Sequence, residues 1–293
     1  MSNTVMDNTI APPAADMSSG KQAADENFPV GSMLIARKLR PHVHAYYAFA
    51  RAIDDIADNN VLSPDAKIAR LDAMQALLLG RESGAAQLGP AEAASAVRLR
   101  DSLAVTGIDP ARGTDLIVAF RQDAVKSRYA SWAELANYCR YSANPVGLYL
   151  LDLHGEGCAT HAPSDALCTA LQVLNHLQDC REDLVELGRC YLPEAWLHQA
   201  GETVEGVRAN RASPGLRRVL DQALDEVDRL NRDAARLPGL ISDRRMRLEA
   251  AVIVGLSHRL ARRLRRGDPL ARRVKLSRPD VAASLLAAFR HLV

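Results

Sequence analysis

The feature that most constrains the fold of this chain is a helical spacing of apolar residues, which runs from about residue 43 to the C-terminus. Apolar side chains recur there at steps of three and four, and no run alternates with the period of two that marks a strand. Aromatic residues make up only 4% of the chain, which also disfavours a sheet-rich protein. The pattern predicts an all-α helical bundle, and no linker rich in Pro, Gly or Ser divides it.

Breaks containing glycine and proline separate the expected helices. Ser63 followed by Pro64 is typical of a helix start, and Ser131 and Glu134 have the spacing of a capping box. The expected helices span residues 43–59, 64–79, 91–105, 110–127, 132–152, 165–186, 214–236, 242–265 and 279–291. Residues 1–26 contain no apolar run and are expected to be a disordered tail, whereas residues 27–293 are expected to form one helical domain.

Composition excludes several classes of protein. Hydrophobic residues make up 48% of the chain and charged residues 25%, which allows a packed core and excludes wholesale disorder. The formal net charge of +2 gives no overall reason to expect a nucleic-acid partner. The five cysteines are odd in number and form no CxxC pair, and the N-terminal residues lack the features of a signal peptide. A reduced cytoplasmic protein is expected.

The first chemical signal is an acidic face on the expected helix 43–59. Tyr47, Arg51, Asp54 and Asp58 recur at i, i+4, i+7 and i+11, which places them on one side of the helix. The simplest alternative is an exposed acidic patch. That alternative is weak, because acidic residues are favoured near the start of a helix and these lie toward its end.

The second signal is the repeat of Asn175, Asp179 and Asp183 on the expected helix 165–186. Two helices that each carry an Asp-x-x-x-Asp pair can present four carboxylates across a bundle. Four such charges are costly to bury unless a cation compensates them. Mg²⁺ prefers oxygen ligands and is usually completed by substrate phosphates. The pair of motifs therefore predicts Mg²⁺ and a phosphorylated ligand.

Two arginines lie where they could meet anionic oxygens. Arg189 follows the second acidic helix, and Arg51 lies on the first. A guanidinium can bind a phosphate through two hydrogen bonds. An ion pair with an acidic neighbour is an equally good interpretation of each arginine.

These motifs resemble the squalene/phytoene synthase family. The resemblance rests on Tyr-x-x-x-Arg-x-x-Asp-x-x-x-Asp at 47–58, Asn-x-x-Gln-Asp-x-x-x-Asp at 175–183, Gly-Arg-x-Tyr-Leu-Pro at 188–193 and Tyr-Cys-Arg-Tyr-Ser-Ala at 138–143. It covers residues 26–290 and keeps the order of the family's motifs. The resemblance implies an all-α isoprenoid synthase bundle with a central apolar cavity.

The resemblance also implies roles for individual residues. It implies that Asp54, Asp58, Asp179 and Asp183 are catalytic residues that bind Mg²⁺, and that Tyr138 is a catalytic cavity tyrosine linked to proton transfer. It implies substrate-binding or metal-shell positions for Ser32, Tyr47, Arg51, Gln172, Asn175, Arg189 and Tyr191. His176, beside the second motif, is expected to lie behind the site or at the surface, because Mg²⁺ prefers oxygen to nitrogen.

One departure bears on the reaction. Many members of the family that condense two diphosphates have Arg before the Asp of the second motif, and this chain has Gln178. Residues 26–30 and 175–180 resemble most the bacterial hydroxysqualene synthases of hopanoid biosynthesis. The resemblance then implies a C30 substrate, presqualene diphosphate, attack by water, and no NADPH. Condensation of two prenyl diphosphates to presqualene diphosphate, squalene or phytoene is the alternative, and a non-catalytic assembly factor is a more remote one.

The C-terminal third is strongly basic. Residues 244–278 contain twelve Lys or Arg, against Glu249 and Asp268 alone. This stretch is either a solvated helix face or a surface that contacts anionic lipid. Nucleic-acid binding is not expected, since no aromatic residues are interleaved with the arginines. The sequence does not predict an oligomeric state.

Overall fold

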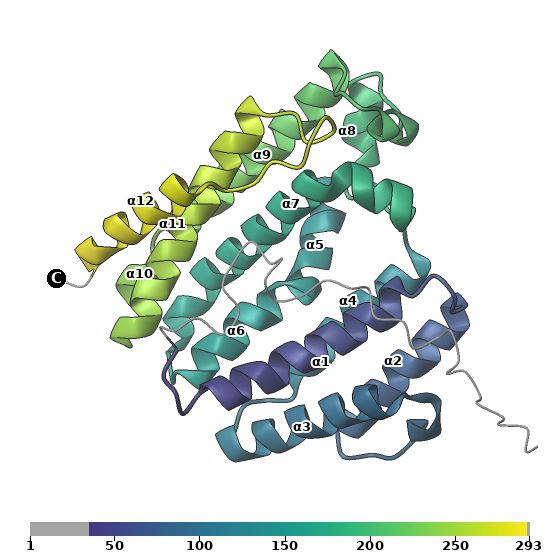
Figure 1. Cartoon of the computed structure of the whole chain (residues 1–293), viewed down its shortest axis with the longest axis vertical. Helices are drawn as coiled ribbons and strands as arrows, with labels where there is room; N and C mark the ends of the chain where they lie inside the picture. Colours follow the sequence, from purple (N-terminus) through teal and green to yellow (C-terminus); the bar gives the residue numbers. More distant parts are fainter. Residues whose placement is uncertain (1–34, 292–293) are drawn as a thin grey trace, which may run out of the picture.

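The structure is a computed structural model, which describes residues 35–291 and, within them, contains helices and no strands (Figure 1). The all-α prediction is therefore confirmed. The helices are α1 (Arg40–Asp58), α2 (Pro64–Leu78), α3 (Pro90–Thr106), α4 (Ala111–Val125), α5 (Trp132–Ser142), α6 (Asn144–Leu153), α7 (His161–Glu186), α8 (Glu194–Gln199), α9 (Pro214–Ala234), α10 (Leu237–Leu240), α11 (Arg244–Arg266) and α12 (Arg278–Ala288). The expected tail and Ser32 lie outside the described residues.

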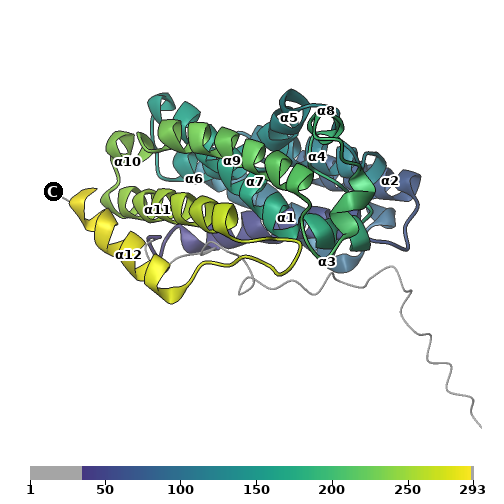
Figure 2. The same cartoon turned by 90° about the horizontal axis from the view of Figure 1, so that it is seen from above.

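The helices gather around two main apolar clusters. The first joins α1, α2, α3 and α4 and includes the buried side chains of Phe49 and Ile117. The second joins α7 and α9 to α5 and α11 and includes Leu174 and Leu224. Figure 1 shows α6 between α7 and α1, and Figure 2 shows α12 lying along α11 at one edge of the bundle. The acidic helices α1 and α7 thus belong to different halves of the core.

Local sequence signals account for the helix starts. The side chain of Ser63 accepts a hydrogen bond from the backbone N–H of Ala66, and that of Ser131 accepts one from Glu134. Each bond satisfies one of the backbone donors that the first turn of a helix leaves unpaired. Both predicted N-caps are confirmed. The capping box at Ser131 is not completed, because the side chain of Glu134 accepts from the backbone N–H of Ala130 instead.

The expected helix 132–152 is two helices, so this prediction was wrong. α5 ends at Ser142, and α6 begins at Asn144 with Pro145 in its first turn. Proline donates no backbone hydrogen bond and disfavours helical geometry in the residue before it, so a helix rarely runs through it unbroken. α7 also begins at His161, earlier than expected, and the short helices α8 and α10 were not predicted.

Within the described residues, no helix is long and apolar enough to cross a bilayer.

Candidate active site

The acidic face of α1 forms as predicted, and an arginine of the same helix neutralises it. Nη1 of Arg51 lies 2.5 Å from Oδ2 of Asp54, and Nη2 lies 3.0 Å from Oδ1 of Asp55. Tyr47 precedes Arg51 by one turn and is half-buried. The ion-pair interpretation of Arg51 is thus what the structure contains, and the guanidinium remains next to the carboxylates that a metal would use.

Arg189 connects the end of α1 with the segment after α7. Its side chain is only 8% exposed, and Nη1 lies 2.5 Å from Oδ1 of Asp58. Nη2 donates to the backbone carbonyls of Ala57 and Asp123, each at 3.1 Å. The backbone N–H of Arg189 donates to the carbonyl of Asp183 at 3.1 Å. One arginine therefore brings the last residue of the first acidic motif and the last residue of the second to one region.

The charge of Arg189 is secured by its surroundings. Burial alone would lower the pKa of this guanidinium, but Asp123, Tyr191 and Asp58 outweigh burial and hold the pKa above its ordinary value. Arg189 is therefore a fixed positive charge at the junction of the two motifs.

Asp123, on α4, is a site residue that the sequence analysis missed. It is buried, and the hydroxyl of Tyr138 donates to its Oδ2 at 2.7 Å. Its other oxygen, Oδ1, accepts no hydrogen bond from the described residues. Burial raises the pKa of Asp123 to about 7, although the charge of Arg189 and the bond from Tyr138 both act to lower it.

A cavity of about 200 Å³ opens beside Asp123. Asp58, Lys67 and Arg189 also line it. Together with Lys126, the cavity therefore holds a carboxylate of the first motif, a buried carboxyl whose pKa is raised to about 7, and three cationic side chains. A carboxyl group with such a pKa is suited to exchange a proton near neutral pH.

On α7, the second motif is paired with a loop near the C-terminus. Nε of Arg273 lies 2.7 Å from Oδ1 of Asp179, and Nη2 donates to Oδ2 at 2.9 Å. The adjacent Gln178 is buried and its side-chain amide donates to the carbonyl of Val274 at 2.5 Å. Asp183 lies one turn beyond Asp179 and is half-buried. The loop thus supplies a positive charge next to the position where the sequence has a neutral glutamine.

Aromatic side chains form the wall next to this site. The rings of Tyr138 and Tyr191 lie 5.8 Å apart, and that of Tyr129 lies 5.4 Å from Tyr138. His176 stacks on Tyr191 at 3.6 Å, and its Nε2 lies 3.3 Å from the side-chain nitrogen of Gln172. Tyrosine faces of this kind can stabilise a nearby cation.

Of the two positions expected for His176, the one at the surface was wrong. It is buried, and burial together with Arg189 lowers the pKa of its imidazole to about 3. The ring is therefore neutral at physiological pH and acts as a packing partner of Tyr191.

The donor chemistry of the two motifs fits a hard divalent cation, since every predicted ligand is a carboxylate oxygen. Among residues 35–291, however, no three His, Cys, Asp or Glu side chains converge into a ready metal cluster. Arginines pair instead with Asp54, Asp58 and Asp179. The Mg²⁺ prediction stands on the type of these ligands and not on a cluster that is already assembled.

A helical bundle that carries an acidic pair on each of two helices, with arginines at both pairs, defines an all-α isoprenoid synthase. The crystal structure of the squalene synthase HpnC from Alicyclobacillus acidocaldarius has the same fold, with a TM-score of 0.70 and 33% identity over 83% of this chain and 90% of that one. The family model of squalene/phytoene synthase matches residues 21–280. The chain belongs to the squalene/phytoene synthase family.

Two curated relatives carry a more specific name. The chain is 44% identical to the hydroxysqualene synthase of Rhodopseudomonas palustris over 263 residues, which cover 90% of this chain and 87% of that protein. It is 40% identical to the hydroxysqualene synthase of Sinorhizobium fredii, over 86% of this chain and 84% of that protein. The predicted family and the predicted resemblance to these members are confirmed.

Proposed function

We propose that this enzyme converts presqualene diphosphate and water to hydroxysqualene and diphosphate. The observation that supports the proposal most strongly is Arg189, which contacts Asp58 at the end of α1 and the carbonyl of Asp183 in the second motif. A diphosphate held between the two acidic helices would meet this cation. The hydroxysqualene synthase relatives support the choice of substrate and of water as the second reactant.

Asp54, Asp58, Asp179 and Asp183 are the residues that would hold Mg²⁺. When bound, Mg²⁺ supplies charge neutralisation for the departing diphosphate. Arg51, Arg189 and Arg273 already lie at three of these carboxylates and are positioned to exchange a carboxylate partner for a diphosphate oxygen. The remaining predicted substrate contacts are Tyr47, Gln172, Asn175 and Tyr191, with Ser32 outside the described residues.

Asp123 is suited to receive the proton that the reaction releases. Loss of diphosphate breaks a C–O bond and leaves a carbocation, and attack by water forms a new C–O bond and frees one proton. Oδ1 of Asp123 has no donor among the described residues, and the pKa of this carboxyl is about 7, so it can accept a proton near neutral pH. Tyr138 holds Oδ2 and thereby orients the carboxyl group.

Condensation of two prenyl diphosphates is the second candidate reaction. The ion pair of Arg273 with Asp179 favours this reaction. Arg273 supplies a positive charge next to Asp179, where many condensing members of the family have an arginine at the position of Gln178. Gln178 itself is engaged with the backbone of Val274 and contributes no charge. A non-catalytic assembly factor would have no need of four acidic residues in two motifs, so this reading is the least favoured.

The two reactions are separated by their substrates. We would incubate the purified protein and Mg²⁺ with presqualene diphosphate or with farnesyl diphosphate, with and without NADPH, and identify the lipids. The proposal expects hydroxysqualene from presqualene diphosphate, with no effect of NADPH. Rapid consumption of farnesyl diphosphate alone would identify a condensing enzyme instead.

We further propose that the enzyme works in the cytoplasm at the inner face of the membrane. Its proposed substrate and product are C30 lipids that partition into a bilayer, and its C-terminal third is basic. Direct contact with anionic lipid would shorten the path of both molecules.

A further inference from the structure

α12 exposes an apolar face to solvent. Val281 is 40% exposed, Leu285 41%, Leu286 72% and Phe289, which directly follows the helix, 54%. Their spacing at i, i+4, i+5 and i+8 places them on one side. Single exposed apolar residues are common on protein surfaces, but four on one side of the same helix indicate an interaction surface.

The side of α12 that borders this apolar face is fixed on α11. Ser284 and Ala288 are buried there, and Nε of Arg259 donates to the hydroxyl of Ser284 at 3.0 Å. Arg263 pairs with Asp280 in the first turn of α12 at 2.5 Å. These contacts hold the apolar face outward.

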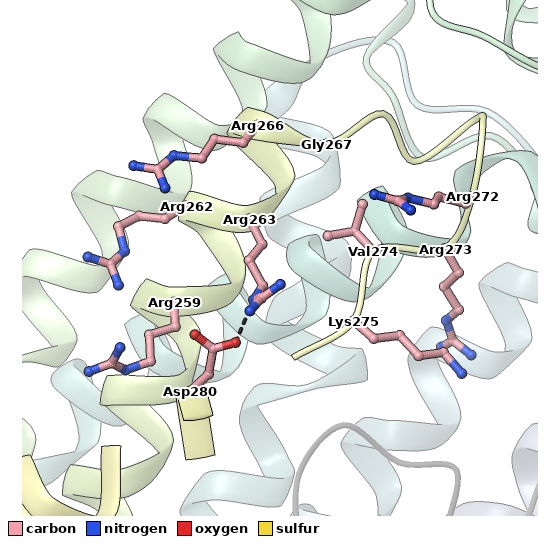
Figure 3. Close-up of a pocket in the computed structure, with 10 residues that line it drawn as sticks. All are labelled: Arg259, Arg262, Arg263, Arg266, Gly267, Arg272, Arg273, Val274, Lys275 and Asp280. Carbon is pink, nitrogen blue, oxygen red and sulfur yellow. Dashed lines mark hydrogen bonds and ion pairs between the residues drawn. The ribbon is translucent and has the colours of Figure 1, made fainter. Parts of the chain in front are cut away.

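A basic pocket of about 550 Å³ adjoins the start of α12. Asp280 lines this pocket, and the next residue, Val281, begins the apolar face. The pocket is lined by seven cationic side chains, those of Arg259, Arg262, Arg263, Arg266, Arg272, Arg273 and Lys275 (Figure 3).

Most of this positive charge is not neutralised within the protein. Arg263 is paired with Asp280, and Arg273 with Asp179. In the part of the chain that the structure describes, no ion pair involves Arg262, Arg266, Arg272 or Lys275. Like charges crowded into one pocket repel one another, so an anionic ligand would stabilise the arrangement.

We propose that the apolar face of α12 and the adjacent basic pocket together form a docking surface for an anionic phospholipid bilayer, with the lipid phosphates in the pocket and the apolar side chains among the acyl chains. The inference rests on the proposed contact with membrane lipid and assigns it to a surface. Arg273 lines the pocket and also binds Asp179, so the docked lipid lies next to the second acidic motif.

Charge complementarity favours a bilayer over a second copy of the chain. A symmetric dimer through this face would bring two positive pockets together, which is unfavourable. An anionic bilayer offers phosphate groups to the basic pocket and hydrocarbon to the adjacent apolar face of α12.

The test is flotation of the full-length protein with vesicles of phosphatidylcholine alone or of equal parts phosphatidylcholine and phosphatidylglycerol. Wild-type protein should float with the anionic vesicles and remain behind with the neutral ones. Arg262→Gln combined with Arg266→Gln should weaken partitioning about 25-fold, since each basic residue contributes about a factor of 5 at such a surface. Leu286→Ser combined with Phe289→Ser should weaken it at least about tenfold.

Matched controls come from α3, which lies away from α12 in Figure 1. Val105 is 78% exposed and Arg98 is also exposed. Val105→Ser and Arg98→Gln change the same types of side chain and should float as the wild type does. Circular dichroism would check that every variant is folded.

Equal flotation with both vesicles, no flotation, or variants that float like the controls would each overturn the inference. A wild-type dimer that does not bind vesicles, and that becomes a monomer when Leu286→Ser and Phe289→Ser are combined, would assign the face to self-association and overturn the inference too.

Turnover of presqualene diphosphate in detergent separates this inference from the proposed function. Protein that turns over but does not float refutes the docking surface alone, and protein that floats but does not turn over refutes the proposed reaction alone.

Discussion

Asp58 and Asp54 lie one turn apart on α1 but pair with arginines that differ in burial. Asp58 compensates Arg189, whose side chain is almost fully buried, whereas Asp54 pairs with the more accessible Arg51. Removing one partner of a buried ion pair leaves an uncompensated charge, and this cost falls as the pair becomes more accessible to solvent.

We therefore expect Asp58→Asn to lower the free energy of unfolding by about 3 kcal/mol and Asp54→Asn to lower it by less than about 1 kcal/mol. Denaturant titration would measure both, with the exposed Asp101→Asn on α3 as a control away from both arginines. Equal losses for the two motif residues would mean that the pairing of Arg189 does not stabilise the fold.

Asp123 should make stability depend on pH. Its ordinary pKa is 3.8 and burial raises the pKa to about 7 in the folded protein. The folded state thus keeps a proton that the unfolded state releases, so stability falls as pH rises from about 4 to about 7. Asp123→Asn cannot ionise. It should unfold like the wild type near pH 4 and be more stable by up to about 4 kcal/mol above pH 7.

Unfolding titrations across this pH range would measure the difference, with the exposed Asp101→Asn as a control that should show no such trend. If Asp123 also accepts the reaction's proton, the same variant should lose turnover while gaining stability at high pH. A stability difference that shrinks with rising pH would contradict the assigned burial of Asp123.

The motif residues were predictable because their spacing along one helix carries the signal, as with Asp179 and Asp183. Asp123 could not be predicted as a site residue, because the side chains that contact it belong to other parts of the chain. Arg189 lies 66 residues away and Tyr138 belongs to the next helix. Nothing in the local sequence of α4 distinguishes a carboxyl that will be buried among them.

At the level of elements, Gln178 and Arg273 hold the loop between α11 and α12 against α7. We expect Gln178→Ala to release this loop, because the carbonyl of Val274 loses the donor that the buried Gln178 side chain supplies. Hydrogen exchange in residues 270–276 should become faster while exchange in α7 is unchanged. Gln87→Ala, in the short 3-10 helix Ala85–Gln87 between α2 and α3, serves as the control. Unchanged exchange would show that Arg273 alone holds the loop.

Helix starts were predicted better than helix continuity. Ser63 and Ser131 act through their own first turns, so their local sequence is sufficient. The break between α5 and α6 also had a local cause in Pro145, which the periodicity of the surrounding apolar residues obscured.

At the scale of the whole molecule, the two acidic helices belong to different apolar clusters, and the buried Arg189 connects them. The all-α class and the family could be predicted from periodicity and motifs. The arginine partner of each carboxylate could not, since Arg273 and Asp179 are distant in sequence and meet only through the packing of the C-terminal loop on α7. The central apolar cavity stays a prediction.

The central claim is that carboxylates of both helices hold Mg²⁺ and allow diphosphate to leave a C30 lipid. The most direct measurement is diphosphate release from presqualene diphosphate as Mg²⁺ is titrated into wild type, Asp54→Asn, Asp179→Asn and the control Asp101→Asn, which is exposed on α3. We expect release to require Mg²⁺, to fall on the order of a thousandfold in both motif variants, and to be nearly unchanged in the control. Release that persists without Mg²⁺, or that survives loss of Asp179 at full rate, would contradict the account.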